Sequence, residues 1–386
     1  MSWNKEKIGD HCEITSSKRI FYSEYVDSGV PFYRSKEIIE SSQGQPISEP
    51  LFISLQKYNE IKEQFGVPAP GDMLLTSVGT IGIPYIVKPD DYFYFKDGNL
   101  TWFRNFDGFL LSKFLYYWIG STEGHGILNN TVIGSSQKAL TIASLKQVEF
   151  PLPPVKVQSR IVAILSTYDD LIENNQRQIK LLEEAAQRLY KEWFVDLRFP
   201  GHENVQIVDG VPEGWSKQTV GSVIGKVART TQIMTSDYLD HGTIPIIDQS
   251  RNFIAGYTND SAALVDIGKP VIVFGDHTRI LKYIQFPFAK GADGTQLIVS
   301  DNVKMPQSLL YCSLVNVDLS NYHYARHFKY LKEEQIVIPD ECIATKFDCF
   351  AGNVFRKCQN LRDENLLLTE ARDRLLPKLM SGEIEV

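Results

Sequence analysis

The sequence contains the same long pattern twice, and the second copy begins just past the middle of the chain. A constant shift of 186 positions aligns the later part of each copy without a gap, from Leu145 with Leu331 to Leu189 with Leu375. A long period that occurs only twice indicates tandem duplication of a domain and a helix rather than a solenoid. Shorter matches precede this stretch: Trp3–Gly9 with Trp215–Gly221, Ser23–Gly29 with Ser236–Gly242, and Lys96–Gly98 with Ala292–Gly294.

Each copy ends in an apolar stripe with the spacing of a coiled coil. After Pro151–Pro154, which is suited to the first turn of a helix, apolar residues recur at alternating steps of four and three. Because a helix of this length cannot bury its own stripe, we predict that the two helices pack antiparallel, with the alternative that each folds back onto its own domain. The predicted seam consists of Ile161, Leu165, Ile172, Ile179, Leu182 and Leu189 in the first helix and Phe347, Val354, Leu361, Leu368 and Leu375 in the second.

The remaining segments are typical of short strands separated by Gly, Pro and Asp-Gly turns. The predicted fold class is therefore α+β: two similar mixed α/β domains joined by two long helices in an antiparallel coiled coil, with pseudo-twofold symmetry. The expected ranges are 1–153 and 199–339 for the domains and 154–198 and 340–386 for the helices. The expected elements are strands at 30–33, 73–75, 92–95, 244–247, 271–274 and 296–299 and a helix at 110–120.

Composition narrows the class of protein. The sequence contains no apolar run of about 18 residues, as a membrane span would need, and its first residues lack the apolar core of a signal peptide. Its five cysteines have no C-x-x-C spacing, which favours reduced thiols and a cytoplasmic location. The net charge is −7, so DNA binding would require local basic patches or partner subunits that supply positive charge.

Catalytic motifs are missing from the sequence. It has no phosphate-binding loop, no H-E-x-x-H zinc motif and no G-x-S-x-G nucleophile elbow. His323 and His327 lie four apart, but no Cys, Asp or Glu completes a metal set with them. We therefore expect no enzyme activity, no cofactor and no metal, and the chain is better suited to recognition or to a scaffold.

Basic and amide side chains occur at matched but divergent places of the two copies. Arg and Lys recognise guanine, Asn and Gln recognise adenine, and Ser and Lys hold phosphates. Each stretch alone is more often a solvated surface, but different polar residues at equivalent positions suit two readers of different half-sites. The candidate DNA contacts are Lys18, Arg19, Arg34, Lys36, Ser135, Ser136, Gln137 and Lys138 in the first copy and Arg229, Gln249, Arg251, Arg279, His323, Arg326 and Lys329 in the second.

Three phrases make the chain resemble the specificity subunit of type I restriction–modification systems. They are Phe150–Ile161 leading into Ile172–Asn175, then Leu189–Phe194, and the terminal Leu375–Ile384. The second copy departs from the first phrase at Asp340–Ile343, where the family usually repeats Pro-Pro-x-x-x-Gln.

This resemblance implies that each globular unit is a target recognition domain for one half of a bipartite double-stranded DNA sequence. It also implies that the helices set the spacer and dock two methyltransferase subunits, and that restriction/motor subunits join the complex. The competing hypotheses are a methyltransferase or nuclease that works alone, which the missing motifs disfavour, and a coiled-coil scaffold whose globular ends bind protein. The target sequence and spacer length do not follow from the residues.

Overall fold

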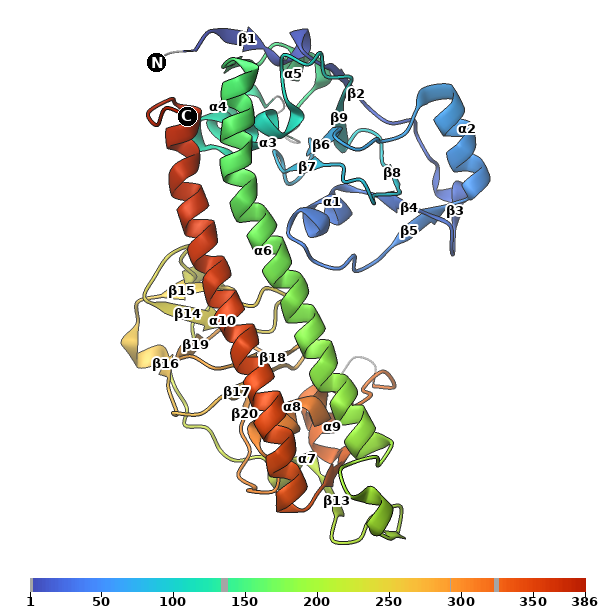
Figure 1. The fold of residues 1–386 in the computed structure, drawn as a ribbon, viewed down its shortest axis with the longest axis vertical. Coiled ribbons are helices and arrows are strands. Elements are labelled where there is room, and N and C mark those ends of the chain that lie inside the picture. Colours follow the sequence, from blue (N-terminus) through green and yellow to red (C-terminus); the bar gives the residue numbers. More distant parts are fainter. Residues whose placement is uncertain (1–2, 133–137, 292, 323–325) are drawn as a thin grey trace. The chain divides into compact units, whose positions relative to one another are not determined.

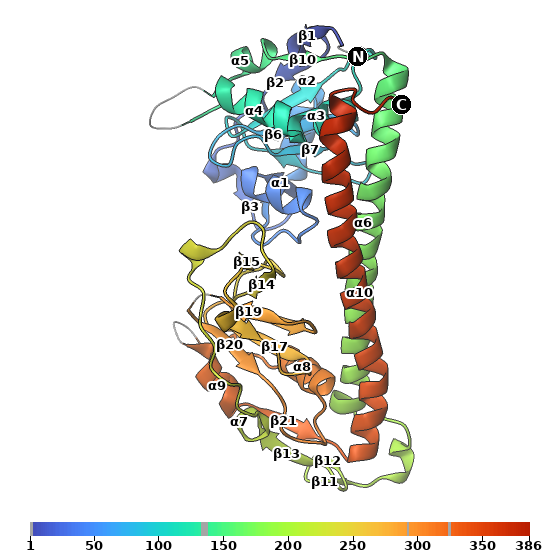
Figure 2. The ribbon, with the colours of Figure 1, turned by 90° about the vertical axis from the view of Figure 1, so that its left-hand side faces the viewer.

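The computed structural model describes residues 3–132, 138–291, 293–322 and 326–386, and Figures 1 and 2 show it in two views. The chain divides into two compact units. Unit 1 comprises residues 1–174 and 365–386, and unit 2 comprises residues 175–364. Two long helices, α6 (Val155–Tyr190) and α10 (Glu341–Met380), therefore contribute one half to each unit.

Unit 1 contains two four-stranded sheets. One has the order β2-β9-β6-β7 and is antiparallel throughout; the other has the order β3-β5-β4-β8, and its β4 and β8 are parallel, with Phe32 opposite Tyr94. The strands are β2 (Glu13–Thr15), β3 (Tyr25–Val26), β4 (Val30–Tyr33), β5 (Leu51–Ile53), β6 (Met73–Thr76), β7 (Pro84–Ile86), β8 (Tyr94–Phe95) and β9 (Leu100–Arg104). The helices beside them are α1 (Ser35–Ser42), α2 (Leu55–Phe65), α3 (Ser112–Gly120), α4 (Thr122–Thr131) and α5 (Ile142–Lys146).

Unit 2 repeats this plan. One sheet has the order β15-β14-β19-β16 and again holds one parallel pair, β14 with β19; the other has the order β18-β17-β20. Its elements are β14 (Ile244–Ile247), β15 (Gly256–Thr258), β16 (Leu264–Val265), β17 (Val271–Gly275), β18 (Leu281–Ile284), β19 (Phe288–Lys290), β20 (Thr295–Ile298), α7 (Val220–Val223), α8 (Gln307–Val315) and α9 (His327–Glu333). A hairpin of β11 (Ile207–Val208) and β12 (Val211–Pro212) precedes them.

The duplication extends to single hydrogen bonds where the chain enters and leaves each unit. In unit 1, β1 (Lys5–Lys7) pairs with β10 (Glu149–Pro151), and in unit 2, β13 (Ser216–Thr219) pairs with β21 (Gln335–Ile338), both antiparallel. The amide of Ile8 donates to the Val148 carbonyl at 3.0 Å, and the matched amide of Val220 donates to Glu334 at 2.9 Å. The two sheets and this closure confirm that the units are copies of one fold.

A glycine is required at the same point of both copies. A Cβ atom on Gly9 would lie 2.8 Å from the Cβ of Lys146, and one on Gly221 would lie 3.1 Å from the Lys332 carbonyl oxygen. These approaches are closer than ordinary contacts between carbon or oxygen atoms, so a side chain would force the closing turn apart. The Ile8-Gly9 and Val220-Gly221 pairs of the repeat thus mark the points where the chain packs closely against Lys146 and Lys332.

The long helices run antiparallel in each unit. In unit 1, Arg372 of α10 forms an ion pair with Asp169 of α6 at 2.6 Å, and the buried Ile161 and Leu165 share a core with Leu379. In unit 2, Arg362 of α10 pairs with Glu183 of α6 at 2.5 Å. The predicted pairing of the two helices is confirmed within both units.

The helix starts differ between the copies for a visible reason. In the first copy Gln158 is fully buried: its amide nitrogen donates to the carbonyls of Phe109 (2.7 Å) and Pro153 (2.8 Å), and its oxygen accepts from the Leu111 amide. In the second copy Asp340 caps the helix by accepting from the Ile343 amide at 3.0 Å, and it also accepts from the Trp215 indole. The departure at Asp340 therefore replaces one way of fixing the helix start with another.

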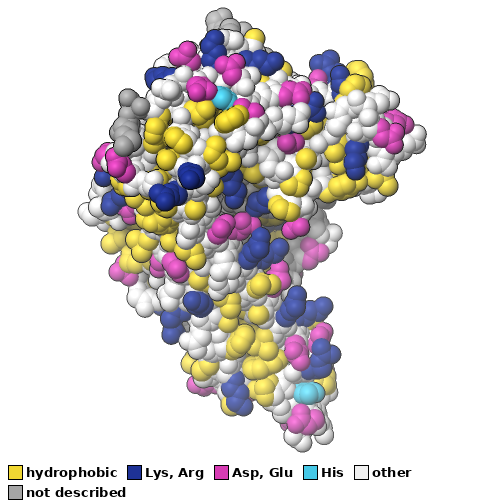
Figure 3. Space-filling view, turned by 45° about the horizontal axis from the view of Figure 1, so that its top comes forward, with side chains coloured by type: hydrophobic (Ala, Val, Ile, Leu, Met, Phe, Trp, Pro, Cys, Tyr) yellow, Lys and Arg dark blue, Asp and Glu magenta, His cyan; other side chains and the backbone are white. Residues whose placement is uncertain are grey.

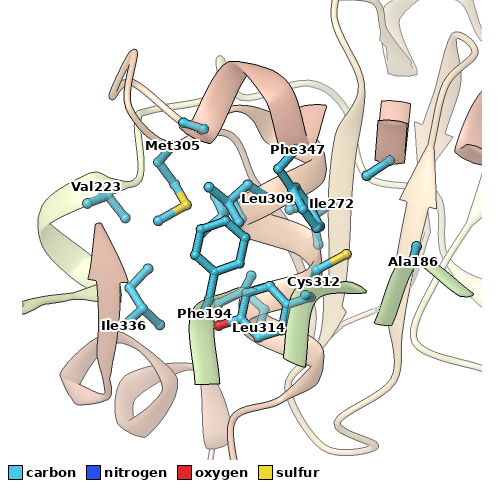
Figure 4. Packing of buried hydrophobic residues seen from close by; sticks show 14 of the residues in the cluster. Ala186, Phe194, Val223, Ile272, Met305, Leu309, Cys312, Leu314, Ile336 and Phe347 are labelled. Atoms are coloured by element: carbon cyan, nitrogen blue, oxygen red, sulfur yellow. The ribbon is translucent and has the colours of Figure 1, made fainter. Parts of the chain in front are cut away.

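The largest core lies in unit 2 and joins both long helices to the globular part. Phe347 of α10 is fully buried against Tyr190, Trp193 and Phe194 of α6 and the π-helical turn Lys191–Val195 that follows it. Figure 4 shows Phe194 and Phe347 in the same cluster as Leu309 and Cys312 of α8 and Ile272 of β17. The Ser308 hydroxyl of α8 donates to Asp348 of α10 at 2.5 Å, which fixes α8 on the long helix.

Most predicted elements are confirmed with small shifts of their ends. The strand expected at 92–95 is shorter, at Tyr94–Phe95, because Asp91 accepts hydrogen bonds from the Tyr85 hydroxyl and the Lys88 amide in a turn just before it. The helix expected at 110–120 begins at Ser112. All five cysteines are free thiols. In the described part of the chain, no helix combines the length and the apolar character of a membrane span.

The buried Phe347 provides a test of the helix contact in unit 2. Phe347→Ala is expected to lower the free energy of unfolding by about 3–5 kcal/mol, because it removes a fully buried ring and leaves a cavity. Phe350, one turn along the same helix, is 44% exposed, so Phe350→Ala is the matched control and should cost less than about 1 kcal/mol. Urea unfolding followed by tryptophan fluorescence measures both. Equal losses for the two variants would contradict this packing.

Candidate nucleic-acid interface

In unit 1 a hollow of about 510 Å³ opens beside the Asp97-Gly98 turn. Its lining combines the predicted Arg19 with residues that the sequence analysis did not select, Lys96, Asp97 and Asn99. The Arg19 Nε donates to Asp97 Oδ2 at 2.9 Å, and the Arg19 side chain is 69% exposed. The apolar part of the lining is Ile20, Val78 and Ala139. This hollow offers hydrogen-bond donors and acceptors on an accessible surface.

Two further candidates of unit 1 lie beside this region. The amide of Lys18 donates to the Tyr94 hydroxyl at 2.6 Å, and its ammonium group lies 4.1 Å from the centre of the Phe65 ring. Lys138 is exposed and precedes Ala139 of the hollow. The predicted Ser135, Ser136 and Gln137 lie outside the described residues.

Arg34 and Lys36 are engaged in ion pairs of different kinds. The Arg34 guanidinium binds the fully buried Glu37 through Nη2 at 2.5 Å and through Nε at 3.1 Å, and the Arg34 amide donates to the same carboxylate at 2.6 Å. This hydrogen bonding raises the pKa of Arg34 above its ordinary value despite partial burial. Lys36 pairs with Glu49 at 2.9 Å on the exposed surface. Arg34 therefore has a structural role in unit 1.

In unit 2 Gln249 connects three loops. Its amide nitrogen donates to the Asp293 carbonyl at 2.8 Å, its side-chain oxygen accepts from the His277 amide at 3.1 Å, and its own carbonyl accepts from Thr278. Both ends of the amide are thus occupied in holding the turn at Gly294, where a Cβ atom would lie 2.7 Å from the His277 ring. The structure places Gln249 as a support for the Asp293-Gly294 turn.

Positive charge gathers next to the same turn. Burial lowers the pKa of Lys290, with a smaller lowering from the nearby charge of Arg229, while Asp293 acts in the opposite direction. Arg229 itself is exposed. Gln232, which is not among the predicted candidates, donates from its amide nitrogen to Asp293 Oδ1 at 3.2 Å. The turn therefore brings together the predicted Gln249 and Arg229 with Lys290 and Gln232, which were not predicted.

Arg279 is fixed at a strained loop position, with φ of 60°. Its Nε donates to His327 Nε2 at 3.2 Å and its Nη2 donates to the Tyr322 carbonyl at 3.0 Å. Burial, and then the neighbouring Arg279 charge, lower the pKa of His327, so this imidazole is neutral and accepts at physiological pH. The nearby Arg326 and Lys329 are exposed, and His323 lies outside the described residues.

Arg251 lies in a different environment from the other candidates of unit 2. It lines a hollow of about 180 Å³ together with Glu183 of α6 and Arg362 of α10. The same hollow contains Lys282, whose ammonium group donates to the Asn252 carbonyl at 2.5 Å. Burial lowers the pKa of Lys282 to about 8. The sequence pattern predicted Arg251 as a DNA contact, but in the fold it lines a hollow beside α6 and α10.

The described residues contain no group of three His, Cys, Asp or Glu that could hold a metal ion. On the face drawn in Figure 3, basic and acidic side chains alternate with apolar ones, without one continuous basic stripe. Such a surface suits hydrogen-bonded recognition more than strong, sequence-independent attraction to phosphates.

Comparison with known proteins agrees with this organisation. Residues 1–184 match the family described as "Type I restriction modification DNA specificity domain". The MjaIX specificity subunit of a type I restriction enzyme from Methanocaldococcus jannaschii is 27% identical over 100% of this chain and 94% of the relative. A putative type I specificity subunit from Haemophilus influenzae is 30% identical over 48% of this chain and 45% of the relative. The crystal structure of the type I S subunit of M. genitalium has the same fold, with a TM-score of 0.57, 16% identity and coverage of 98% and 96%.

Along its whole length the chain is therefore similar to the family of type I restriction–modification specificity subunits, and residues 1–184 match the DNA specificity domain of that family. This is a family of non-catalytic subunits, in which the catalytic activities reside in other chains of the complex.

The ion pair between Arg34 and Glu37 leads to a prediction about the stability of unit 1. Arg34→Ala leaves the buried Glu37 carboxylate without its guanidinium partner, so we expect unit 1 to lose about 1–3 kcal/mol of stability. Lys36→Ala removes the same charge from an exposed pair and should change stability by less than about 1 kcal/mol. Thermal unfolding of the two variants checks this. A stable Arg34→Ala protein would show that Glu37 finds another partner.

Proposed function

We propose that this chain selects the DNA sequence on which a type I restriction–modification complex acts, with each unit recognising one half of a bipartite target. The observation that carries the proposal is that two copies of one fold present different polar side chains at equivalent positions. Arg19 stands beside Asp97 in unit 1, whereas Gln232 stands beside Asp293 in unit 2. Two copies with the same readers would suit a symmetric target, and two copies with different readers suit a target with unlike halves.

The proposed DNA contacts are the exposed predicted side chains beside the two Asp-Gly turns, together with Lys96 and Asn99. The predicted ones are Lys18, Arg19 and Lys138 in unit 1 and Arg229 in unit 2. Arg34, Gln249 and Arg279 support the same regions through the hydrogen bonds described above, so their substitution would affect recognition indirectly. The net charge of −7 is compatible with this function if partner subunits supply most of the contacts to phosphates.

The outer faces of α6 and α10 are the proposed docking surfaces for two methyltransferase subunits, with restriction/motor subunits joining the same complex in the cytoplasm. Of the eleven predicted seam residues, Ile161, Leu165, Phe347, Val354 and Leu361 are buried, and the other six are half-buried. On the opposite faces the repeat places Leu181 and Leu367, which are 64% and 67% exposed. Each is followed by an ion pair in register, Glu184 with Arg188 and Glu370 with Arg374. One surface thus occurs twice, as two identical partners would need.

The first test concerns activity. The purified chain with a methyl donor is expected to leave DNA unmethylated and uncut, because its sequence contains no phosphate-binding loop, zinc motif or nucleophile elbow. Addition of its methyltransferase partner should give adenine methylation at a two-part site, read by sequencing that detects methylated bases. Methylation by the chain alone, or methylation by the complex at a continuous site, would contradict the proposal.

The second test concerns docking. Leu181→Asp and Leu367→Asp each place a charge on one of the two matched surfaces without touching the cores, so the chain should stay folded. Each variant is expected to bind one methyltransferase subunit instead of two, and the double variant none, as native mass spectrometry would show. Leu171, which is 42% exposed on α6 outside the matched pair, gives the control Leu171→Asp. Two bound subunits on the double variant would rule out this surface.

A further inference from the structure

Two equivalent aspartates, Asp97 in unit 1 and Asp293 in unit 2, each bind a different side chain. In unit 1 Asp97, followed by Gly98 at φ of 75°, accepts from the Nε of Arg19 at 2.9 Å. In unit 2 Asp293, followed by Gly294 at φ of 83°, accepts from the amide nitrogen of Gln232 at 3.2 Å. Both contacts join segments that are far apart in the sequence.

The two contacts occupy equivalent positions of the duplication. The shift of 213 that aligns Ser23 with Ser236 also takes Arg19 to Gln232, and the shift of 196 that aligns Gly98 with Gly294 takes Asp97 to Asp293. The fold supports this alignment, because the next residues, Ile20 and Ile233, are buried to similar extents, 6% and 7% exposed. A 3-10 turn then begins at Tyr22 in one unit and at Thr235 in the other, again a shift of 213.

The carboxylate leaves different hydrogen-bonding groups available in the two units. Arginine has five N–H donors, and with Nε bound to Asp97 the two terminal nitrogens of Arg19 have no hydrogen bond to another described residue. A pair of donors at the end of a planar group matches the two acceptors of guanine, O6 and N7.

In unit 2 the carboxylate also sets the orientation of an amide. An ionised carboxylate only accepts hydrogen bonds, so Asp293 binds the nitrogen end of the Gln232 amide. One N–H and the carbonyl oxygen of Gln232 then remain. A donor next to an acceptor matches N7 and the N6 amino group of adenine.

We infer that Arg19 and Gln232 are specificity-determining residues of the two half-sites, the first reading guanine and the second adenine, with Asp97 and Asp293 as their positioning residues. This inference rests on the proposed function and names the residues by which it operates. Stability is a weak alternative explanation, since exposed ion pairs contribute little. In addition, the second unit keeps the contact with an uncharged partner.

The test exchanges the two readers in the complex of the full chain with its methyltransferase, followed by mapping of methylated adenines in DNA. Arg19→Gln is expected to change one position of one half-site from guanine to adenine, and Gln232→Arg should make the reverse change in the other half-site. Each change should shift the preference between the two bases by about 10- to 100-fold. A mapped motif that is identical for the wild type and both variants would overturn the inference.

A second pair of variants separates reading from charge. Arg19→Lys keeps the positive charge but lacks the planar fork, so it should relax the guanine preference while the salt dependence of binding stays the same. Lys113, an exposed residue of α3, provides the control Lys113→Ala, which should leave the motif unchanged. Because lysine can also bind guanine, the decisive outcome is the strength of the preference: a guanine preference as strong in Arg19→Lys as in the wild type would contradict reading by the fork.

The positioning role is tested by Asp97→Ala and Asp293→Ala. Each should relax the base preference only at the position that its partner reads, and Asp97→Asn, which keeps an acceptor, should restore part of it. Loss of all methylation with normal folding would contradict a role confined to one base. If the wild-type complex methylates no bipartite site, the proposed function fails; if it does and these variants leave the motif unchanged, only the present inference fails.

Discussion

The packing of each unit against a helix from the other copy of the repeat is the interaction on which the rest of the structure depends. The core of unit 1 contains Leu376, Leu379 and Met380 from the end of the chain. The core of unit 2 contains Ala186, Tyr190 and Phe194 from the end of the first copy. Because about 25 cal/mol is gained for each Å² of apolar surface buried, these contacts contribute several kcal/mol to each core. Neither copy would complete its hydrophobic core with its own residues alone.

The helix pair and the surfaces around the two Asp-Gly turns are held together by different interactions. The helices are held by buried aromatic and aliphatic side chains and by ion pairs such as Arg372–Asp169, which fix the antiparallel register. The surfaces around the Asp-Gly turns consist of polar side chains held by carboxylates and by backbone groups, as with Arg19 and Arg279. Such a division keeps the scaffold constant between the two copies while the residues at the turns differ.

Much of the fold could be predicted from the sequence because its signals are local or repeated. The heptad spacing predicts the long helices, the shift of 186 predicts that they are equivalent, and runs such as Val271–Phe274 predict buried strands. The partners of the polar side chains could be predicted only in part. The contact of Arg34 with Glu37 is an i,i+3 pair that the sequence displays. The contacts of Gln232 with Asp293 and of Arg251 with the helix hollow depend on how distant segments fold together. The Asp-Gly pair that occurs in both copies indicates a shared turn at Asp293, but the sequence does not indicate that Gln232 binds it.

The strand pairs β1–β10 and β13–β21 have a consequence for how such a chain can change during evolution. In each unit the polypeptide enters and leaves the globular part through two adjacent antiparallel strands, and the turn behind them is closed by a glycine that touches the exit segment. Everything between the two strands is therefore equivalent to one large insertion with neighbouring ends. Under the proposed function, a gene that exchanged this insertion for another of the same fold would keep its helices and the partner subunits that dock on them, and would acquire a new half-site in a single recombination event.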